Sequence, residues 1–271
     1  MKKITLIFIA VCMASHSWAW GPTGHRVIAQ VAYHYMSART VHKIDAELGA
    51  HGMVYWAAWP DEIRSEQTIY PSSYDWHYQD MPAGMTDEQV IASVTDYPRH
   101  GGQLWRTMDT LTTQLMNLCR MRHPQDSVLY VNGEQLTYHD ALVFLVHLTG
   151  DNFCPMHMAH EEDMGGNQLT IYWFGRQTNL HKVWDEDLIR ARELSYTEYA
   201  QMLMDCYGNW EPDKSRREYI PELYHTTQSI YAGYDAGMMT YRYIWTWRDT
   251  CDRWLYIAGR ILAQTLNELY K

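Results

Sequence analysis

The sequence predicts a mainly α-helical protein with a minor β-hairpin component. Apolar residues recur at helical spacing along most of the 271 residues, whereas the alternation typical of strands is confined to short segments. No internal repeat, low-complexity segment or linker rich in Pro, Gly or Ser divides the chain. With 46% hydrophobic residues, the chain can build one domain with a sizeable core.

The first part of the chain, residues 1–19, has the pattern of a secretory signal peptide. A basic start is followed by an apolar centre over residues 4–13 and by a small-x-small cleavage site at residues 17–19. We therefore expect an exported protein, periplasmic or secreted, whose mature domain covers 20–271 and begins at Trp20. No later segment is apolar for long enough to cross a membrane.

The net charge and the cysteines limit the kinds of molecule and bond that can be expected. Removal of the leader takes away two lysines and no acid, so the formal charge moves from −10 to −12. This balance argues against a protein that binds duplex DNA with a basic surface, but not against a nucleic-acid enzyme whose positive charge comes from bound metal. The mature chain keeps Cys119, Cys154, Cys206 and Cys251. In an exported protein they predict disulfide bonds, at most two, in any of three connectivities.

The N-terminal third is predicted to be helical in short pieces. From Thr23 a stripe of apolar residues at helical spacing predicts a first helix. Ser37 is expected to cap a second helix that ends before Gly49. A third short helix is expected around residues 56–63, and an irregular or extended stretch follows over 72–82.

The middle of the chain is predicted to combine helices with a hairpin. Thr86 and Gln89 form a capping box before an apolar turn. A longer helix is expected over about 102–120. Residues 128–138 then resemble a hairpin that turns at Asn132-Gly133, since this dipeptide favours the tight turns that join strands.

The rest of the chain is predicted to be helical around a second small hairpin. Thr137 caps an apolar helix that Pro155 closes. Residues 168–178 alternate enough for the hairpin. From His181 onward we expect helices, with a break near residues 208–212.

The stretch from His147 to Asp185 concentrates residues with metal-binding chemistry. It holds two His-x-x-x-Asp pairs, His147/Asp151 and His181/Asp185, with His157 between them. Residues four apart on a helix lie on one face, so each pair can direct an imidazole and a carboxylate to one point. Imidazole nitrogen and carboxylate oxygen are the usual ligands of catalytic zinc. One such pair is common on solvated helices, but two pairs so close together predict a metal site.

Several motifs, in order, make the chain resemble the S1/P1 nuclease family. They are WGPTGH, WPDEIR, WHYQD, HLTGDNFCPMH, DMGGN and NLHKVWD, and the C-terminal AGRILAQTLN is similar to the family's closing helix. Members of this family are secreted, single-strand-specific zinc nucleases that also act as 3′-nucleotidases. The resemblance covers nearly the whole mature chain. It implies a single helical domain of the phospholipase C/P1 nuclease type, with three zinc ions in a cleft.

The resemblance also implies the metal ligands, residue by residue. One zinc would be held by Asp61, His77, His147 and Asp151. A second would be held by His157, His181 and Asp185. The third would take His25 together with the α-amino group and carbonyl oxygen of Trp20, and Asp151 would bridge the first and third ions. The α-amino group exists only after the leader has been cleaved.

Four further residues are implied in catalysis or substrate binding, beside Asp151. The family places Arg64 near the phosphate, where its guanidinium would offset developing charge; a surface salt bridge with Asp61 is the alternative. Asp80 and Asn167 are implied close to water and substrate, although an Asn after two glycines can equally be a turn residue. Tyr78 is a candidate face for base stacking, with a role in the core as the alternative.

Two positions depart from the family's pattern. Cys154 stands where the family usually has Gln, and Pro60 replaces a small residue before Asp61. Neither change removes a ligand. Cys154 itself is not expected to bind zinc, because no site lacks a ligand.

These residues predict metal-assisted phosphoester hydrolysis. The expected enzyme is an endonuclease that uses a metal-bound hydroxide to hydrolyse single-stranded DNA or RNA to 5′-nucleotides, and that also acts as a 3′-nucleotidase. A zinc phospholipase C, which shares the fold and the N-terminal Trp ligand, is the alternative enzyme, but DMGGN and NLHKVWD favour the nuclease. A zinc-scavenging or structural metal protein is the other class, although structural zinc sites are usually rich in Cys. Preference among RNA, DNA and mononucleotides, oligomeric state and pH optimum stay open.

Overall fold

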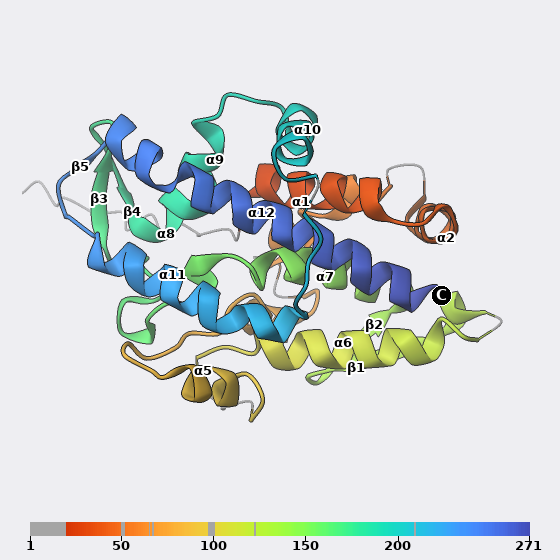
Figure 1. Ribbon diagram of the computed structural model, residues 1–271. Coiled ribbons are helices and arrows are strands. Elements are labelled where there is room, and N and C mark those ends of the chain that lie inside the picture. The colour runs from red at the N-terminus through yellow and green to blue at the C-terminus, as the bar shows by residue number, and fades with distance from the viewer. Residues whose placement is uncertain are drawn as a thin grey trace, which may run out of the picture.

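The structure is a computed structural model that describes residues 20–49, 52–64, 66, 68–96, 101–121, 123–208 and 210–271. The predicted signal peptide, residues 1–19, lies outside the described residues. The described part of the chain is mainly helical, with a few short strands, as the sequence predicts (Figure 1). No helix in this part is both long and apolar enough to cross a membrane.

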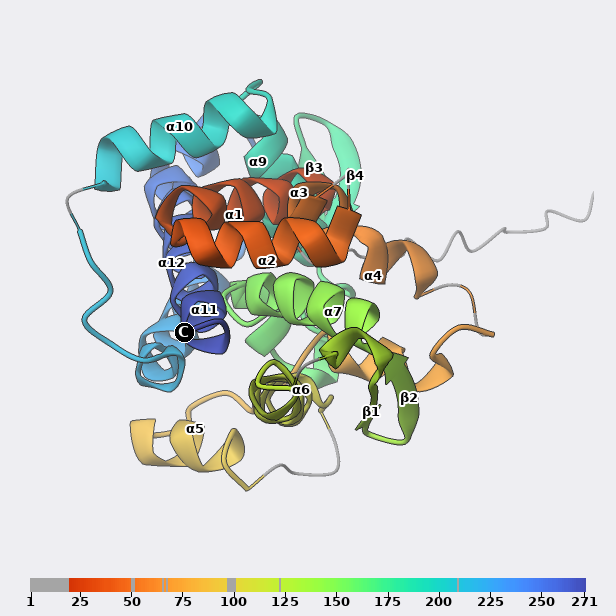
Figure 2. The ribbon, with the colours of Figure 1, turned by 90° about the vertical axis from the view of Figure 1, so that its right-hand side faces the viewer.

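Helix α7 (Tyr138–Asp151) lies at the centre of the fold. Every residue from Ala141 to Asp151 is buried, and the helix is apolar on nearly all sides, as a helix surrounded by others must be. It packs against α1 (Pro22–Tyr35), α6 (Leu104–Leu118) and the long α12 (Tyr241–Leu269). In Figure 2, α7 lies between α1 and α2 on one side and α6 on the other. Side chains at the end of α7 therefore reach the interior.

The first helices follow the sequence, with one exception. Helix α1 begins one residue before Thr23, and the side chain of Ser37 caps α2 (Ala38–Leu48) as predicted. The prediction of a single helix around residues 56–63 is wrong. The structure has two helices there, α3 (Gly52–Trp56) and α4 (Trp59–Ile63), because Pro60 fits only the first turn of a helix and so starts a new one.

The middle elements confirm the predicted caps and turn. The 3₁₀ helix η2 (Pro71–Trp76) is followed by α5 (Asp87–Ser93), whose capping box of Thr86 and Gln89 is complete. After α6 and η3 (Pro124–Asp126), strands β1 (Val128–Val131) and β2 (Glu134–Thr137) form the antiparallel hairpin. Asn132 and Gly133 both have positive φ at its turn, and Thr137 caps α7.

The C-terminal elements include a small three-stranded sheet at one end of the molecule (Figure 1). In chain order they are η4 (Pro155–Met158), η5 (Glu161–Asp163), β3 (Thr170–Trp173), β4 (Arg176–Asn179), α8 (Leu180–Lys182), the π-helix η6 (Val183–Asp187), α9 (Leu188–Arg190), α10 (Tyr196–Tyr207), η7 (Arg216–Tyr219), α11 (Ile220–Ala232), β5 (Met238–Met239) and α12. The predicted hairpin is β3–β4. The unpredicted β5 pairs parallel with β3 (Figure 1).

The cysteines do not form the expected disulfide bonds. Cys119, Cys154, Cys206 and Cys251 are all free thiols. The sulfur atoms of two of them already have partners. Cys119 donates to the Leu269 carbonyl and Cys154 to the Asp185 carboxylate. An oxidising compartment permits disulfides, but the fold must bring two sulfurs into bonding geometry, and this one does not.

Candidate metal centre

The histidine and aspartate residues that the sequence predicts as metal ligands lie close together in the interior of the protein. They come from α1, α4, the segment after η2, the end of α7, η4 and the α8–η6 segment. Each has at most 6% of its surface exposed: His25, Asp61, His77, His147, Asp151, His157, His181 and Asp185. Buried ionisable groups at this density need partners, because an unpaired charge away from water is costly.

The carboxylate of Asp151 lies at the centre of this cluster. Its Oδ2 atom is 3.0 Å from His77 Nδ1 and 3.4 Å from His147 Nε2. Its Oδ1 atom is 3.3 Å from His25 Nε2 and 4.0 Å from His157 Nδ1. Both oxygens are therefore surrounded by imidazole, as a carboxylate shared between two metal sites would be.

The four residues expected around the first metal have the spacing of ligands of one ion. His77 Nδ1 and His147 Nε2 are 3.1 Å apart, and each is 3.7 Å from Asp61 Oδ1. With the distances to Asp151, all measured separations fall between 3.0 and 3.7 Å. Ligands about 2.0–2.1 Å from a tetrahedral zinc lie about 3.3 Å from one another. The residues present thus fit a zinc ion.

A second group lies around Asp185. His181 Nε2 is 3.0 Å from Asp185 Oδ2, and His157 Nε2 is 4.0 Å from Oδ1 of the same carboxylate. His181 is on α8 and Asp185 is in the π-helix that follows, so the four-residue spacing brings both side chains together even though the backbone is not a regular α-helix. Such π-helical turns occur frequently at functional sites.

Backbone carbonyls orient three of the imidazoles. The Nδ1 atom of His147 is 2.7 Å from the Ala57 carbonyl, that of His157 contacts the His77 carbonyl, and that of His181 is 2.6 Å from the Gly165 carbonyl. An N–H donated to a carbonyl leaves the lone pair on Nε2, which faces the cluster in each case. This is the usual arrangement around metal-binding histidine.

Several buried polar atoms of the cluster have no hydrogen-bond partner among the described residues. They are His25 Nε2, both oxygens of Asp61, His77 Nε2, Asp151 Oδ1 and His157 Nε2. Buried polar groups are nearly always satisfied, and an exception indicates a missing ion, water or catalytic role. A cation among these donors would satisfy several of them at once.

The pKa values differ from one residue of the cluster to another. Burial lowers the pKa of His25 to about 4 and that of His77 to about 3, and it raises the pKa of Asp61 to about 7. His147 is different. Burial would lower its pKa, but the carboxylates of Asp151 and Asp61 together raise it to about 9. Neutral imidazole is the form that binds metal, so the pKa values of His25 and His77 suit ligands.

The side chain of Trp20, the predicted first residue of the mature chain, is held next to the end of α7. The indole is fully buried, and its N–H donates to the Gly150 carbonyl at 3.0 Å. Gly150 also allows the close approach of His25, because a Cβ atom there would lie 2.8 Å from His25 Nδ1. His25 in turn stacks on His147, with ring centroids 3.8 Å apart. Trp20 and His25 are thus brought to the end of α7.

Arg64 and two tyrosines line one side of the cluster. The guanidinium of Arg64 is 3.7 Å from Asp61, the salt bridge considered as the alternative, and it also lies 5.6 Å from the ring centre of Tyr74. Tyr78, half-buried, makes an edge contact with Tyr74. Tyr74, which is 50% exposed, was not predicted from the sequence. The only sequence signal was its place three residues before His77.

Asp80 and Asn167 lie in different environments. The pKa of Asp80 is raised to about 7, chiefly by burial; His181 opposes this increase, and the acidic side chains of η5 add to it. A side chain at Gly165 would meet both Asp80 and His181, so the carboxylate lies near the second group. The amide of Asn167 instead donates to the Met164 carbonyl at 2.8 Å. This contact matches the alternative given above for Asn167, that of a turn residue.

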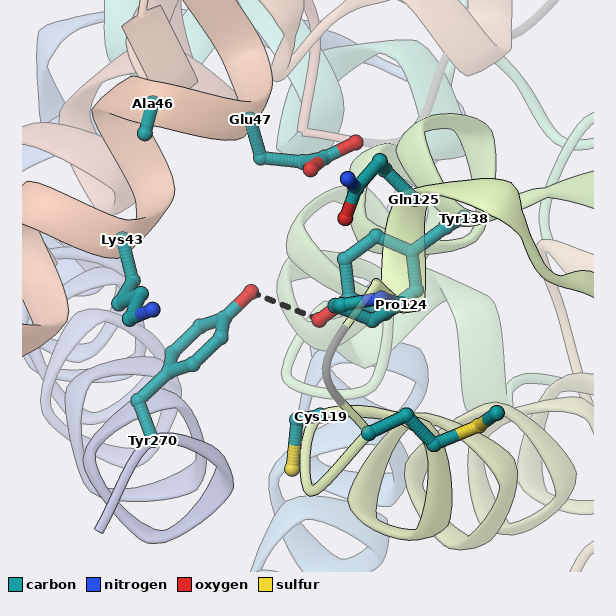
Figure 3. A pocket seen from close by; sticks show the side chains of 9 residues that line it. Lys43, Ala46, Glu47, Cys119, Pro124, Gln125, Tyr138 and Tyr270 are labelled. Atoms are coloured by element: carbon teal, nitrogen blue, oxygen red, sulfur yellow. Dashed lines mark hydrogen bonds between the residues drawn. The ribbon is translucent and has the colours of Figure 1, made fainter.

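A separate cleft of about 360 Å³ lies at the opposite end of α7 (Figure 3). Lys43, Cys119, Tyr138 and Tyr270 are among its lining residues, and the two tyrosine hydroxyls face each other at 3.0 Å. Helix α7 has 14 residues and so spans about 20 Å. The cleft therefore belongs to another part of the molecule and contains none of the predicted ligands.

Comparison with known proteins agrees with this geometry. The sequence model of the family S1/P1 Nuclease matches residues 20–271. The chain is similar to Endonuclease 3 of Arabidopsis thaliana, with 27% identity over 98% of this chain and 94% of the relative. It is also similar to Endonuclease 4 of the same plant, with 29% identity over 73% of this chain and 64% of the relative. Nuclease P1 of Penicillium citrinum is 28% identical over 66% of this chain and 63% of its own length.

The family match spans the whole segment that carries the cluster, and it favours a nuclease over a phospholipase C. Enzymes of this family are metal-dependent and act on nucleic acids, and the His/Asp groups of the chain can hold metal ions. The chain is therefore an enzyme that belongs to the S1/P1 nuclease family.

Proposed function

We propose that the protein is a zinc-dependent endonuclease that hydrolyses single-stranded nucleic acid to 5′-nucleotides and also acts as a 3′-nucleotidase. The observation that carries the proposal is the buried cluster around Asp151, in which imidazole nitrogens and carboxylate oxygens lie at the spacing of zinc ligands. Further buried polar atoms of the same cluster have no hydrogen-bond partner among the described residues. Membership in a nuclease family supplies the reaction class. A structural metal protein is less well supported, because the ligand side chains expected from the sequence are imidazoles and carboxylates, whereas structural zinc sites are usually rich in Cys.

Three zinc ions are proposed, with the ligands expected from the sequence. Asp61, His77, His147 and Asp151 would hold the first ion; His157, His181 and Asp185 the second; and Trp20, His25 and Asp151 the third. Zinc in these positions supplies an acidified water and positive charge for the phosphate. The mature N-terminus at Trp20 requires removal of residues 1–19, so export is part of the proposal.

The surrounding side chains are proposed to position the substrate. Arg64 can donate two parallel hydrogen bonds to non-bridging phosphate oxygens, which stabilises charge that develops during attack. Its contact with Asp61 holds the guanidinium at the edge of the cluster. Asp80 and Asn167 are assigned to water and substrate, with weaker support for Asn167 because its amide is engaged in a turn.

Preference for single strands is proposed to come from the aromatic surface beside the cluster. The ring of Tyr74 lies next to Arg64, and the ring of Tyr78 lies next to Tyr74. A base stacks on such a ring only after it has left its neighbours, and in a duplex that base must first be unstacked and unpaired at a cost in free energy. Single strands avoid this cost.

The test uses the mature chain from Trp20, loaded with zinc. Release of 5′-nucleotides from single-stranded DNA or RNA is measured beside release from duplex DNA and beside release of phosphocholine from phosphatidylcholine. The expected result is rapid release from single strands, slow release from duplex and no phosphocholine. Hydrolysis of the lipid without hydrolysis of nucleic acid, or zinc binding without any turnover, would contradict the proposal.

A further inference from the structure

The thiol of Cys154 lies next to a predicted metal ligand although the cysteine itself was not expected to bind metal. Its Sγ atom is 3.4 Å from Asp185 Oδ1, and both side chains are fully buried. The donor atoms of Cys154, His157 and Asp185 form one compact group. The thiol is thus directed at a carboxylate of the second zinc site.

The backbone of Cys154 is fixed by two other predicted ligands. Its N–H donates to the Asp151 carbonyl at 3.1 Å, and its own carbonyl accepts the N–H of His157 at 3.0 Å. Pro155 follows and restricts the Cys154 backbone to extended conformations, with ψ of 119°. The direction of the side chain is therefore set by the chain that connects the first site to the second.

The two oxygens of Asp185 face different neighbours. Oδ2 is 3.0 Å from His181 Nε2, whereas Oδ1 faces the Cys154 thiol and lies 4.0 Å from His157 Nε2. A donor on one oxygen of a ligating carboxylate limits rotation of the group and leaves defined lone pairs for the metal. Such outer partners typically change metal affinity by about 10–100-fold when they are removed.

We propose that Cys154 is a positioning residue that donates its S–H to Asp185 and holds this carboxylate in the orientation that binds the second zinc. The inference rests on the proposed function, because it assumes the metal site. It assigns a role to the residue by which this chain departs from the Gln usual in the family.

The test compares variants that separate hydrogen bonding from packing. Cys154→Ser keeps a donor in a smaller side chain, whereas Cys154→Val removes the donor and fills the space with a somewhat larger apolar side chain. Cys251→Ala is the matched control, since Cys251 is a buried thiol on α12 away from the cluster. Zinc stoichiometry is measured during titration with a chelator, and far-UV circular dichroism checks the fold.

The expected result is one zinc that binds about 10–100-fold more weakly in Cys154→Val, with the other two unchanged. Cys154→Ser and Cys251→Ala should stay within about threefold of the wild type, a small change on the same scale. A residue that only fills space would give the opposite order, with Ser worse than Val, because it buries a hydroxyl without need. That order would overturn the inference.

Cobalt substitution tests the competing role of the sulfur as a ligand. A cobalt–thiolate bond adds an intense near-ultraviolet charge-transfer absorption, and a thiol that only donates a hydrogen bond does not. We expect no such band in the wild type. A band that Cys154→Ser removes would overturn the positioning role. A wild-type chain without any bound metal would overturn the proposed function as well, whereas three zincs held tightly by Cys154→Val would overturn this inference alone.

Discussion

Replacing Asp151 by Asn is the sharpest perturbation of the cluster. The substitution removes one negative charge and turns one acceptor oxygen into an N–H donor, at a position that is 0% exposed. Both oxygens of the native carboxylate lie beside imidazole nitrogens, Oδ2 at 3.0 Å from His77 and Oδ1 at 3.3 Å from His25. The change should therefore affect the proposed first and third zinc sites together.

The size of the expected effect follows from the proposal that two metal sites share this carboxylate. Removal of one preorganised group that stabilises a transition state costs about 10²–10³ in rate, or about 3–4 kcal/mol. Because Asp151 serves two sites, we expect kcat/KM on single-stranded DNA to fall by at least about 10³, and zinc content to fall with it. The helical circular dichroism should persist, since α7 is held by packing along its whole length.

The control for this variant is Asp252→Asn on α12. Asp252 is also buried, but it bonds to Tyr199 and Arg192 rather than to the cluster. This change should lower the thermal midpoint and leave zinc content unaltered. An Asp151→Asn protein that keeps three zincs and acts within tenfold of the wild type would refute the bridging role.

Four further outcomes are expected. Zinc affinity should rise between about pH 6 and about pH 9. The reason is that two carboxylates raise the pKa of His147 to about 9, against the effect of burial, and zinc must displace the proton of this imidazole. Calorimetry in buffers of different ionisation enthalpy should detect the released proton, and a zinc affinity that does not vary with pH would contradict the prediction. One extra residue before Trp20 should weaken the third zinc and slow hydrolysis, because it converts the terminal amine to an amide, and proteolytic trimming should restore both; equal zinc content and rate in the two forms would remove the amine from the ligands. Gly150→Ala should lower the free energy of unfolding by about 1–3 kcal/mol and weaken binding of the third zinc, because the new Cβ atom would lie 2.8 Å from His25. An unchanged thermal midpoint would count against that contact. Tyr74→Ala should raise KM for single strands by the equivalent of about 1–3 kcal/mol while kcat and zinc content stay constant, as loss of one stacking surface predicts; an unaltered KM would show that no base stacks there.

The parts of the fold that depend on nearby residues could be predicted from the sequence. Ser37 and Thr137 cap their helices because a side chain and an amide three residues later are enough to form the cap. Asn132 and Gly133 form the hairpin turn because they accept positive φ. In each His-x-x-x-Asp pair the two side chains meet because they are only four residues apart in a helical segment. By contrast, β5 has only two residues, so no alternation could reveal it.

The parts that depend on tertiary packing could not be derived from spacing. His25, Asp61 and His77 approach Asp151 from separate elements, and only the resemblance to the family grouped them. Carbonyls such as that of Ala57 carry no sequence signal, because every residue has one. The disulfide prediction failed for a related reason. Cysteine number and compartment say nothing about where the sulfur of Cys154 lies.

The central claim is that the buried cluster holds three zinc ions and that hydrolysis depends on them. The most direct measurement is the zinc content of the mature chain, followed by its rate on single-stranded and duplex DNA before and after a chelator. We expect three zincs per chain, rapid release of 5′-nucleotides from single strands and slow release from duplex, loss of activity on chelation and recovery with zinc. Unchanged hydrolysis by metal-free protein, or a mature chain that binds no zinc, would contradict it.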